Sequence, residues 1–247
     1  MLRSMRLGCD LDGVLANLHG AFVATALDLF PDLDRAAIDA PTVGASPPDP
    51  NRPAGEREPE APRVEPEVVV TPRQTDAIWR RLSGREDFWE TLDEIESGAI
   101  ARLAAVADAR RWEVIFLTSR PISAGQTVQR QSQRWLERHG FPLPSVFVVH
   151  GSRGRIAESL DLDVVIDDRP ENCLDVVLES KAAAVLIWRA AESAVPVSAR
   201  RLGISVAPSV LGCLSTLEES ERSREGSIVQ RIRRLFGLRP AGAVLRR

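Results

Sequence analysis

The chain has 247 residues, 44% of them hydrophobic and 27% charged, and its formal net charge at pH 7 is -3. This length accommodates one substantial core with an accessory segment, and the composition is typical of a globular protein. The small net charge gives no electrostatic reason to expect nucleic-acid binding by the whole chain. No stretch approaches the ~18 consecutive apolar residues that predict a membrane span.

The cysteines and the N-terminal residues favour a cytoplasmic location. The three cysteines are Cys9, Cys173 and Cys213, and no CxxC pair occurs, so the sequence supports neither a zinc site nor a disulfide framework. The N-terminal residues contain no apolar run of signal-peptide length. We therefore expect a protein of the reducing cytoplasm.

The first half of the chain has one strand, several helices and a proline-rich stretch. Apolar spacing predicts a strand over residues 7–9 and helices over residues 14–30, 74–82 and 94–111. Residues 41–72 hold much of the proline, mixed with charged residues and glycine. Because such a composition cannot bury enough apolar surface to offset chain ordering, we interpret this stretch as a loop or disordered insert.

From residue 113 onward, strand and helix patterns alternate, which is typical of parallel βαβ units. The expected strands cover residues 113–117, 146–149, 164–166 and 183–188, and the expected helices cover residues 126–139, 154–160 and 170–178. Together with the first strand, they predict a Rossmann-like α/β core, which is a parallel sheet flanked by helices. We assign residues 1–16 and 96–208 to this core and residues 17–95 to an inserted helical cap.

The last segment, residues 209–247, is interpreted as a C-terminal helical tail, with a mobile tail as an open alternative. A helix is expected over residues 209–221, followed by a short basic amphipathic segment over residues 227–238. That segment could lie on an anionic membrane or a partner. The alternative is a terminal helix that packs on its own domain or frays.

Two acidic pairs follow buried strands. Asp10 and Asp12 come directly after the first strand, and Asp167 and Asp168 come after the strand over residues 164–166. Because ligands of open α/β sheets bind outside the carboxyl ends of the strands, we expect the two pairs to meet. Clustered carboxylates raise one another's pKa unless a cation neutralises them. Oxygen ligands of this kind suit Mg²⁺, so the pattern predicts Mg²⁺-dependent phosphate chemistry.

The string Asp10-Leu11-Asp12-Gly13 is the sharpest motif. Asp10 could attack phosphorus, because a carboxylate is a competent covalent nucleophile. Asp12 could reach the leaving oxygen as a general acid and later act as a base toward water. Gly13 would allow a sharp turn. The alternative is an ordinary strand-to-helix turn, in which Asp and Gly are common.

With these motifs in view, the chain resembles the haloacid dehalogenase (HAD) superfamily of phosphatases. Three of the four family motifs are matched in order by Asp10-Leu11-Asp12-Gly13, Thr118 and Asp167-Asp168. The resemblance implies that Asp10 is the nucleophile, that Asp12 is the acid and base, and that the Thr118 hydroxyl binds phosphoryl oxygens. It also implies a Mg²⁺ site formed by Asp10, Asp167, Asp168 and the main-chain carbonyl of Asp12.

The third motif normally supplies a lysine, and here the chain departs from the family. Its only lysine, Lys181, follows the fourth motif. Arg153 is the best positional substitute and Arg155 is the second. Arginine offers bidentate phosphate contacts, although it is not equivalent to lysine.

Within the superfamily, the chain is similar to the 5'(3')-deoxyribonucleotidase-like group, which also has a cap after the first motif. The strings that carry this similarity are Asp10 to Ala16, Phe88-Trp89, Thr118-Ser119-Arg120-Pro121 and Asp167 to Asn172. By this resemblance Ser119 joins Thr118 in phosphate binding, and Phe88, Trp89 and Arg120 are candidate substrate or cap residues. Cap packing for the two aromatic residues, and a surface ion pair for Arg120, remain open alternatives.

The expected function is a Mg²⁺-dependent phosphomonoester hydrolase that forms an aspartyl-phosphate, with a nucleoside monophosphate as substrate. One alternative is a phosphatase for sugar phosphates or other small esters, and another is a HAD-fold binding or regulatory module without activity. Arg130, Arg134 and Arg138 form a positive stripe on one helix, which we interpret as a solvated face instead of a nucleic-acid site. The sequence does not determine the oligomeric state.

Overall fold

One parallel sheet organises the protein. The structure is a computed structural model, and it describes residues 4–35 and 70–222. Within these residues, six strands form one sheet in the order β3-β2-β1-β4-β5-β6, and each neighbouring pair is parallel. The strands are β1 (Arg6–Asp10), β2 (Glu113–Thr118), β3 (Ser145–Val148), β4 (Val164–Asp167), β5 (Ala183–Ile187) and β6 (Ser205–Ala207). The Rossmann-like α/β fold predicted from the sequence is confirmed.

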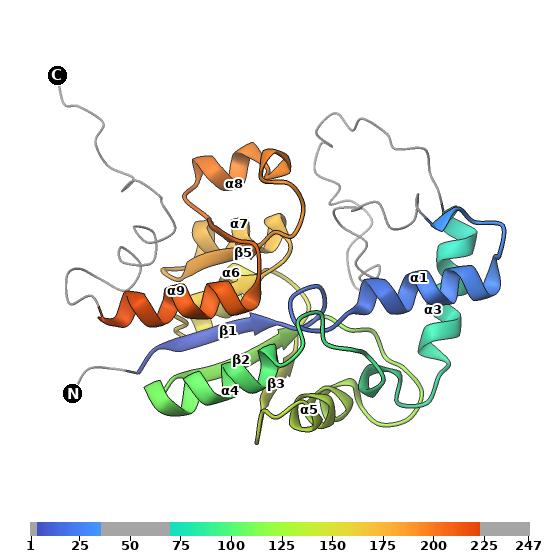
Figure 1. Cartoon of the computed structure of the whole chain (residues 1–247), viewed down its shortest axis with the longest axis horizontal. Helices are drawn as coiled ribbons and strands as arrows, with labels where there is room; N and C mark the ends of the chain where they lie inside the picture. Colours follow the sequence, from blue (N-terminus) through green and yellow to red (C-terminus); the bar gives the residue numbers. More distant parts are fainter. Residues whose placement is uncertain (1–3, 36–69, 223–247) are drawn as a thin grey trace.

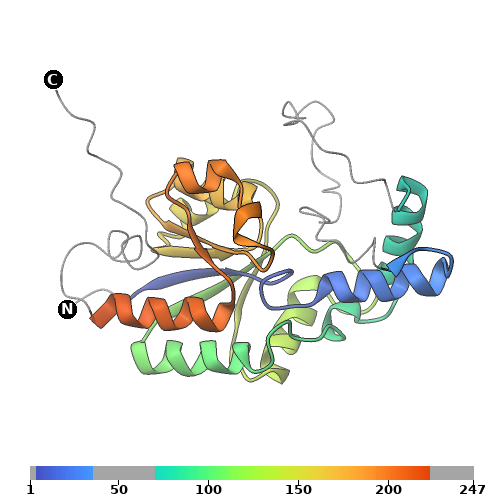
Figure 2. The same ribbon diagram turned by 45° about the horizontal axis from the view of Figure 1, so that its top comes forward.

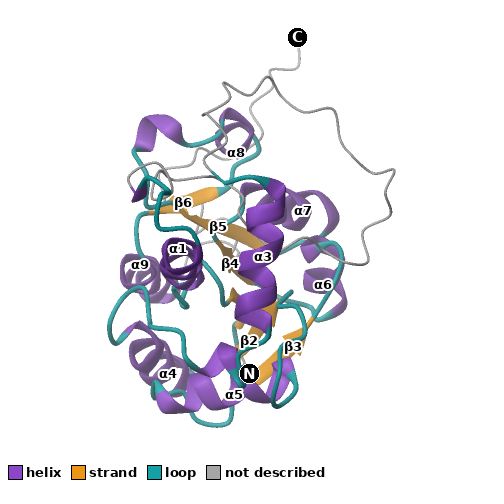
Figure 3. Ribbon diagram, turned by 90° about the vertical axis from the view of Figure 1, so that its right-hand side faces the viewer, coloured by secondary structure: helices purple, strands orange, loops and turns teal. Residues whose placement is uncertain are grey.

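Helices cover both faces of this sheet, with α4 and α9 on one face and α6 and α7 on the other (Figure 3). The helical elements of the described residues are α1 (Leu18–Leu29), α3 (Pro72–Ser83), η1 (Phe88–Glu90), α4 (Ala99–Arg110), α5 (Val128–Arg138), α6 (Arg153–Ser159), α7 (Pro170–Glu179), η2 (Glu192–Ala194), α8 (Val197–Arg201) and α9 (Val210–Arg222). In β4, Val164 and Ile166 face helices α4 and α9, and Val165 faces helices α6 and α7. Because both faces are buried, the strands read as continuous apolar runs.

Helices α1 and α3 lie side by side beyond the carboxyl ends of the strands (Figures 1 and 2). Their contact includes the rings of Phe22 and Trp79, whose centroids are 5.7 Å apart. The two linkers to the sheet are joined by backbone hydrogen bonds, from Ile95 N–H to the Leu15 carbonyl (2.8 Å) and from Asn17 N–H to the Asp93 carbonyl (2.9 Å). The division into a core and a cap at residues 17 and 95 stays a prediction, and these paired linkers support it.

Two of the predicted helices begin later than expected. The helix predicted over residues 94–111 starts at Ala99, because Glu94 forms a bridge with Ala16 and Gly98 adopts a left-handed conformation with φ 79°. The helix predicted over residues 14–30 starts at Leu18, where the Asn17 side chain accepts a hydrogen bond from Gly20 N–H. Both differences follow from the linkers, which use these residues to leave and re-enter the sheet.

The C-terminal part of the core extends beyond the predicted elements. The expected strands end with the one over residues 183–188, but a further strand, β6, pairs with β5 at the edge of the sheet. With three residues, one of them Ser205, β6 is too short to show a periodic pattern. Helix α9 buries Cys213, Leu214 and Leu217 completely in the main hydrophobic cluster. The assignment of residues 209–247 to a tail stays a prediction, and this burial favours counting α9 with the core.

Two predicted segments lie mainly or wholly outside the described residues. The basic segment over residues 227–238 is one of them, and most of the proline-rich stretch over residues 41–72 is the other. The described end of that stretch is ordered as the start of α3. There Thr71 and Gln74 form a reciprocal capping box and Pro72 occupies the first turn.

Candidate active site

The order of the strands in the sheet brings Asp10, Thr118 and Asp167 together at the carboxyl edge of the sheet. Strand β1 lies between β2 and β4, with Asp10 opposite Leu117 and Cys9 opposite Ile166. The three side chains therefore emerge from neighbouring strand ends, as the sequence predicted. Asp10 is 8% exposed, Thr118 1% and Asp167 0%.

Arg153, the first residue of α6, reaches between two of these carboxylates. Its Nη2 donates to Oδ1 of Asp10 (2.8 Å), and its Nε lies 3.6 Å from Oδ2 of Asp167. Arg153 is 3% exposed. Arg155 lies elsewhere, because its side chain is 82% exposed and pairs with Glu179. Of the two arginines that the sequence proposed, the structure brings only Arg153 to the acidic cluster.

The charge balance of this cluster remains acidic despite Arg153. Burial raises the pKa of Asp10 well above its ordinary value; the Asp167 carboxylate raises it further, and Arg153 opposes them. Burial likewise raises the pKa of Asp167, against the lowering effect of Arg153. Asp167 is fixed by the backbone N–H of Arg169 (2.9 Å) and by the amide of Asn172 (2.9 and 3.0 Å). The Asp167 carboxylate therefore has a defined orientation.

Asp168 lies directly against Gly13. A Cβ atom on Gly13 would collide with the Asp168 carboxylate, and Gly13 has φ 84°, so glycine is needed there for both space and backbone conformation. Burial, followed by the neighbouring Asp167, raises the pKa of Asp168 to about 7. Its Oδ1 is buried and has no hydrogen-bond partner.

The donor atoms of this cluster are of the kind that binds a hard cation such as Mg²⁺. The donors are carboxylate oxygens, one of them an orphaned buried atom, and a bound cation would favour the ionised form of Asp10 and Asp168, whose pKa burial raises. Among the described residues, however, no group of three or more His, Cys, Asp or Glu side chains is already arranged to hold a metal ion. Arg153 lies within 2.8 Å of Asp10 and 3.6 Å of Asp167. Metal binding by Asp10, Asp12, Asp167 and Asp168 therefore stays a prediction.

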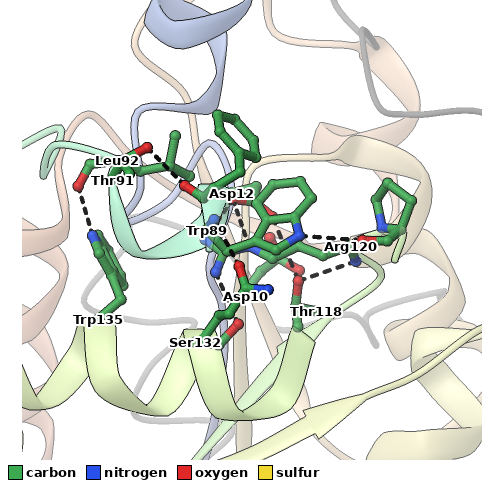
Figure 4. Close-up of polar contacts among 12 residues, drawn as sticks. Asp10, Asp12, Trp89, Thr91, Leu92, Thr118, Arg120, Ser132 and Trp135 are labelled. Carbon is green, nitrogen blue, oxygen red and sulfur yellow. Dashed lines mark hydrogen bonds and ion pairs between the residues drawn. The ribbon is translucent and has the colours of Figure 1, made fainter. Parts of the chain in front are cut away.

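Asp12 is held by Arg120 (Figure 4). The Nε of Arg120 donates to Oδ2 of Asp12 (2.8 Å), its Nη2 donates to Oδ1 (2.8 Å), and the Thr118 hydroxyl lies 3.4 Å from Oδ2. Arg120 is 2% exposed, so this is a buried ion pair and not the surface pair considered from the sequence. Ser119, which lies between Thr118 and Arg120, is exposed.

Phe88 and Trp89, in η1, are each 1% exposed and pack on one another with ring centroids 4.8 Å apart. The indole N–H of Trp89 donates to the Pro121 carbonyl (3.2 Å), and its backbone N–H donates to Oε1 of Gln131 (3.0 Å). This burial supports the packing alternative that the sequence left open. A contact between these rings and substrate stays a prediction.

Sequence reasoning missed the face of α5 that supports this region. Its buried residues include Gln131, Ser132 and Trp135, and the Ser132 hydroxyl accepts a hydrogen bond from Nη1 of Arg120 (2.9 Å). The available signal was two polar residues at positions where helical spacing expects apolar ones. Arg134 and Arg138, also on α5, pair with Glu90 of η1, and their side chains are 43% and 57% exposed, in agreement with solvated charged side chains.

Comparisons with known proteins add three findings. Residues 55–187 match the model of a family described as "5' nucleotidase, deoxy (Pyrimidine), cytosolic type C protein". The mitochondrial 5'(3')-deoxyribonucleotidase of Mus musculus is 25% identical over 169 residues, which cover 68% of this chain and 66% of that protein. The chain thus spans just under two thirds of this relative. The crystal structure of a HAD family hydrolase from Deinococcus radiodurans R1, with bound phosphate and sodium, matches with a TM-score of 0.55 and 16% identity, over 90% of this chain and 99% of that one.

The structural match covers 90% of this chain. It supports the parallel sheet and its flanking helices as a HAD-like arrangement. No helix among residues 4–35 and 70–222 is long and apolar enough to cross a membrane.

Proposed function

The chain belongs to the 5' nucleotidase, deoxy (pyrimidine), cytosolic type C family of the HAD superfamily, and from this premise we propose that it hydrolyses nucleoside monophosphates with Mg²⁺ as cofactor. The proposal is supported by the proximity of Asp10, Asp12 and Thr118 at the carboxyl edge of the sheet. Arg153 donates a hydrogen bond to Asp10, and Arg120 donates to Asp12. This proximity supports the proposed roles of Asp10 as nucleophile, Asp12 as acid and Thr118 as the phosphate-binding hydroxyl.

In the first step, an oxygen of the Asp10 carboxylate attacks phosphorus. The bond from phosphorus to the ester oxygen breaks, and that oxygen takes a proton from the Asp12 carboxyl group as the alcohol leaves. Arg153 orients Asp10 through Oδ1 and supplies positive charge for the phosphoryl oxygens, together with the Thr118 hydroxyl.

In the second step, water hydrolyses the aspartyl-phosphate. The Asp12 carboxylate takes a proton from the water molecule, whose oxygen attacks phosphorus. The bond between phosphorus and the Asp10 oxygen then breaks, which releases inorganic phosphate and restores the Asp10 carboxylate. Both steps need Asp12 at the same place, first with its proton and then without it.

The residues that would hold Mg²⁺ are Asp10, Asp167, Asp168 and, through its main-chain carbonyl, Asp12. When bound, the ion supplies positive charge that lets an anionic carboxylate approach an anionic phosphoryl group. The buried Oδ1 of Asp168, which has no hydrogen-bond partner, supports this assignment.

The substrate is proposed from the family and from the mouse relative, whose printed names specify a 5' nucleotidase and a 5'(3')-deoxyribonucleotidase. A location in the cytoplasm also stays a proposal. The three cysteines are free and buried, in keeping with a reducing compartment, whereas the mouse relative is named as mitochondrial.

The test is phosphate release from a panel of deoxynucleoside, ribonucleoside and sugar monophosphates, each with Mg²⁺ and with EDTA. The proposal predicts Mg²⁺-dependent release that is fastest with deoxynucleoside monophosphates. Faster release from sugar phosphates would retain the mechanism and reject the substrate. No release from any ester by folded protein would reject the hydrolase.

A further inference from the structure

Arg120 is among the most completely buried charged residues of the described chain, and its charge is directed at one partner. Its side chain is 0% exposed, while that of Asp12 is 19% exposed. Two of its nitrogens contact the two carboxylate oxygens of Asp12, with three distances between 2.8 and 3.1 Å. Such fork-to-fork pairing fixes the plane of a carboxylate as well as its position.

The guanidinium of Arg120 is itself fixed from two other elements. Its Cζ lies 4.8 Å from the ring centroid of Trp89 in η1 and 5.7 Å from that of Trp135 in α5. Its remaining terminal nitrogen donates to the hydroxyl of Ser132 (2.9 Å). A cation that contacts two aromatic rings and is hydrogen-bonded through all three nitrogens has little freedom to turn toward another partner.

We propose that Arg120 is the positioning residue for Asp12, an assignment that rests on the function proposed above. Arg120 holds the Asp12 carboxyl group in the orientation from which its proton passes to the leaving oxygen. When the ester bond breaks and that proton leaves, the carboxylate that remains faces the guanidinium. Arg120 therefore acts through Asp12 and not by binding the phosphoryl group, which the geometry leaves to Thr118 and Arg153.

This role separates substrates by their leaving groups. A deoxynucleoside leaves as an alcohol and needs the proton of Asp12, whereas 4-nitrophenol is acidic enough to leave without it. In a single turnover, Arg120→Gln is expected to slow release of the nucleoside by about 100-fold and release of 4-nitrophenol by less than about tenfold, since general acid catalysis contributes factors of this order. Equal slowing of both, or slowing of neither, would overturn the proposal.

The matched control is Arg102→Gln. Arg102 also pairs with a carboxylate, Glu218, but it lies on the surface, with its side chain 45% exposed. Both release rates are expected to stay within about twofold in this variant, because exposed ion pairs contribute little to stability. If the control shows the same selective loss, the selectivity does not come from the Arg120–Asp12 contact and the proposal is wrong.

A second experiment tests whether Arg120 acts through Asp12. Single-turnover rates are compared for Asp12→Asn and for the double variant Asp12→Asn/Arg120→Gln. Because residues that act as one unit are not additive, the second substitution is expected to change the remaining rate by less than about threefold. A further loss as large as that of Arg120→Gln alone would show an independent role in phosphate binding and overturn the proposal.

Folding is monitored by circular dichroism and thermal unfolding, since Arg120 is buried. If Arg120→Gln does not fold, Ser132→Ala replaces it, because this change removes one contact to Arg120 and leaves the guanidinium in place. The selective slowing is then expected to be about fivefold, in line with one lost hydrogen bond, and equal slowing of both substrates contradicts the proposal. An inactive wild-type protein would reject the hydrolase itself, whereas an active one that is insensitive to both substitutions would reject only the positioning role.

Discussion

Arg153 donates a hydrogen bond from Nη2 to Oδ1 of Asp10 over 2.8 Å, while both residues are almost completely buried. A buried ion pair is stable only when each charge keeps its partner. Asp10 has a second acidic neighbour in Asp167, and Arg153 also lies 3.6 Å from that carboxylate. Arg153 therefore supplies positive charge to both Asp10 and Asp167. Along the chain it stands where the family's third motif supplies a lysine.

The first prediction concerns this arginine. Arg153→Gln is expected to lower the rate of phosphate release by about 100-fold or more, because a charged donor at the phosphoryl site is removed. Arg153→Lys keeps the charge without the fork and should recover part of that loss. Arg155→Gln changes only an exposed side chain and should leave the rate within about twofold. A larger effect at Arg155 than at Arg153 would contradict the placement.

The second prediction concerns the contact between Gly13 and Asp168. Gly13→Ala places a Cβ against the Asp168 carboxylate and also strains a backbone with φ 84°. We expect a loss of stability greater than the ~1–3 kcal/mol of strain alone, together with weaker Mg²⁺ binding. Calorimetric unfolding and titration with Mg²⁺ measure both effects.

The control for that prediction is Gly151→Ala. Gly151 has φ 112°, but a Cβ there would meet no atom within 4 Å. This variant should show backbone strain without any change in Mg²⁺ affinity. Equal loss of stability and affinity in the two variants would mean that the collision with Asp168 has no effect of its own.

The third prediction concerns Gly154, which brings α6 close to α7. A Cβ at this position would collide with the backbone carbonyl of Asp175. Gly154→Ala should therefore push α6 away and displace the adjacent Arg153, so that activity falls by about tenfold or more, as for misplaced catalytic groups generally. Gly212→Ala in α9 is the matched change, because there the new Cβ meets only the movable hydroxyl of Ser209. Full activity in Gly154→Ala would contradict this account of the packing.

The fourth prediction concerns Glu96, which links three parts of the chain. It accepts hydrogen bonds from the backbone N–H groups of Val210 and Leu211, at the start of α9, and it pairs with Arg189 at 2.7 Å. Burial alone would raise the pKa of Glu96, but these hydrogen bonds and the Arg189 charge lower it below the ordinary value of 4.5.

A carboxylate whose pKa is lowered on folding stabilises the protein above its unfolded pKa, and this contribution disappears as the pH falls through the folded value. Glu96→Gln should therefore lower the midpoint of thermal unfolding at pH 7. The difference from wild type should shrink as the pH falls below about 4.5, the ordinary pKa of glutamate. Glu113→Gln, which alters an exposed pair with Arg6, should show little difference at either pH. A difference for Glu96→Gln that does not change with pH would reject the electrostatic explanation.

The sequence alone predicted the parts of the site that depend on local pattern. Asp10, Thr118 and Asp167 each follow an apolar strand, and parallel strands bring such residues to one edge. Arg153 could be proposed ahead of Arg155 from its order along the chain, but no local pattern showed that only one of them reaches the acidic cluster. The difference arises from the direction of the first turn of α6, which points Arg153 inward and Arg155 toward Glu179.

Other features depend on contacts between distant segments and had no local pattern. The pair of Arg120 and Asp12 requires η1 and α5 to meet around the guanidinium, with Trp89 and Trp135 on its faces. Strand β6 is defined by its pairing with β5 and not by its own composition. The late start of α4 likewise follows from the pairing of Glu94 with Ala16, which tertiary structure imposes on a sequence that could otherwise be helical.

The proposed mechanism depends on a covalent bond between Asp10 and the phosphoryl group. The most direct measurement is phosphate release from a deoxynucleoside monophosphate with Mg²⁺, by the wild-type protein and by Asp10→Asn, with circular dichroism to show that both are folded. The account predicts release by the wild type and a loss of at least about 1,000-fold in Asp10→Asn, because the amide cannot act as the nucleophile. Substantial release by folded Asp10→Asn would contradict the covalent mechanism.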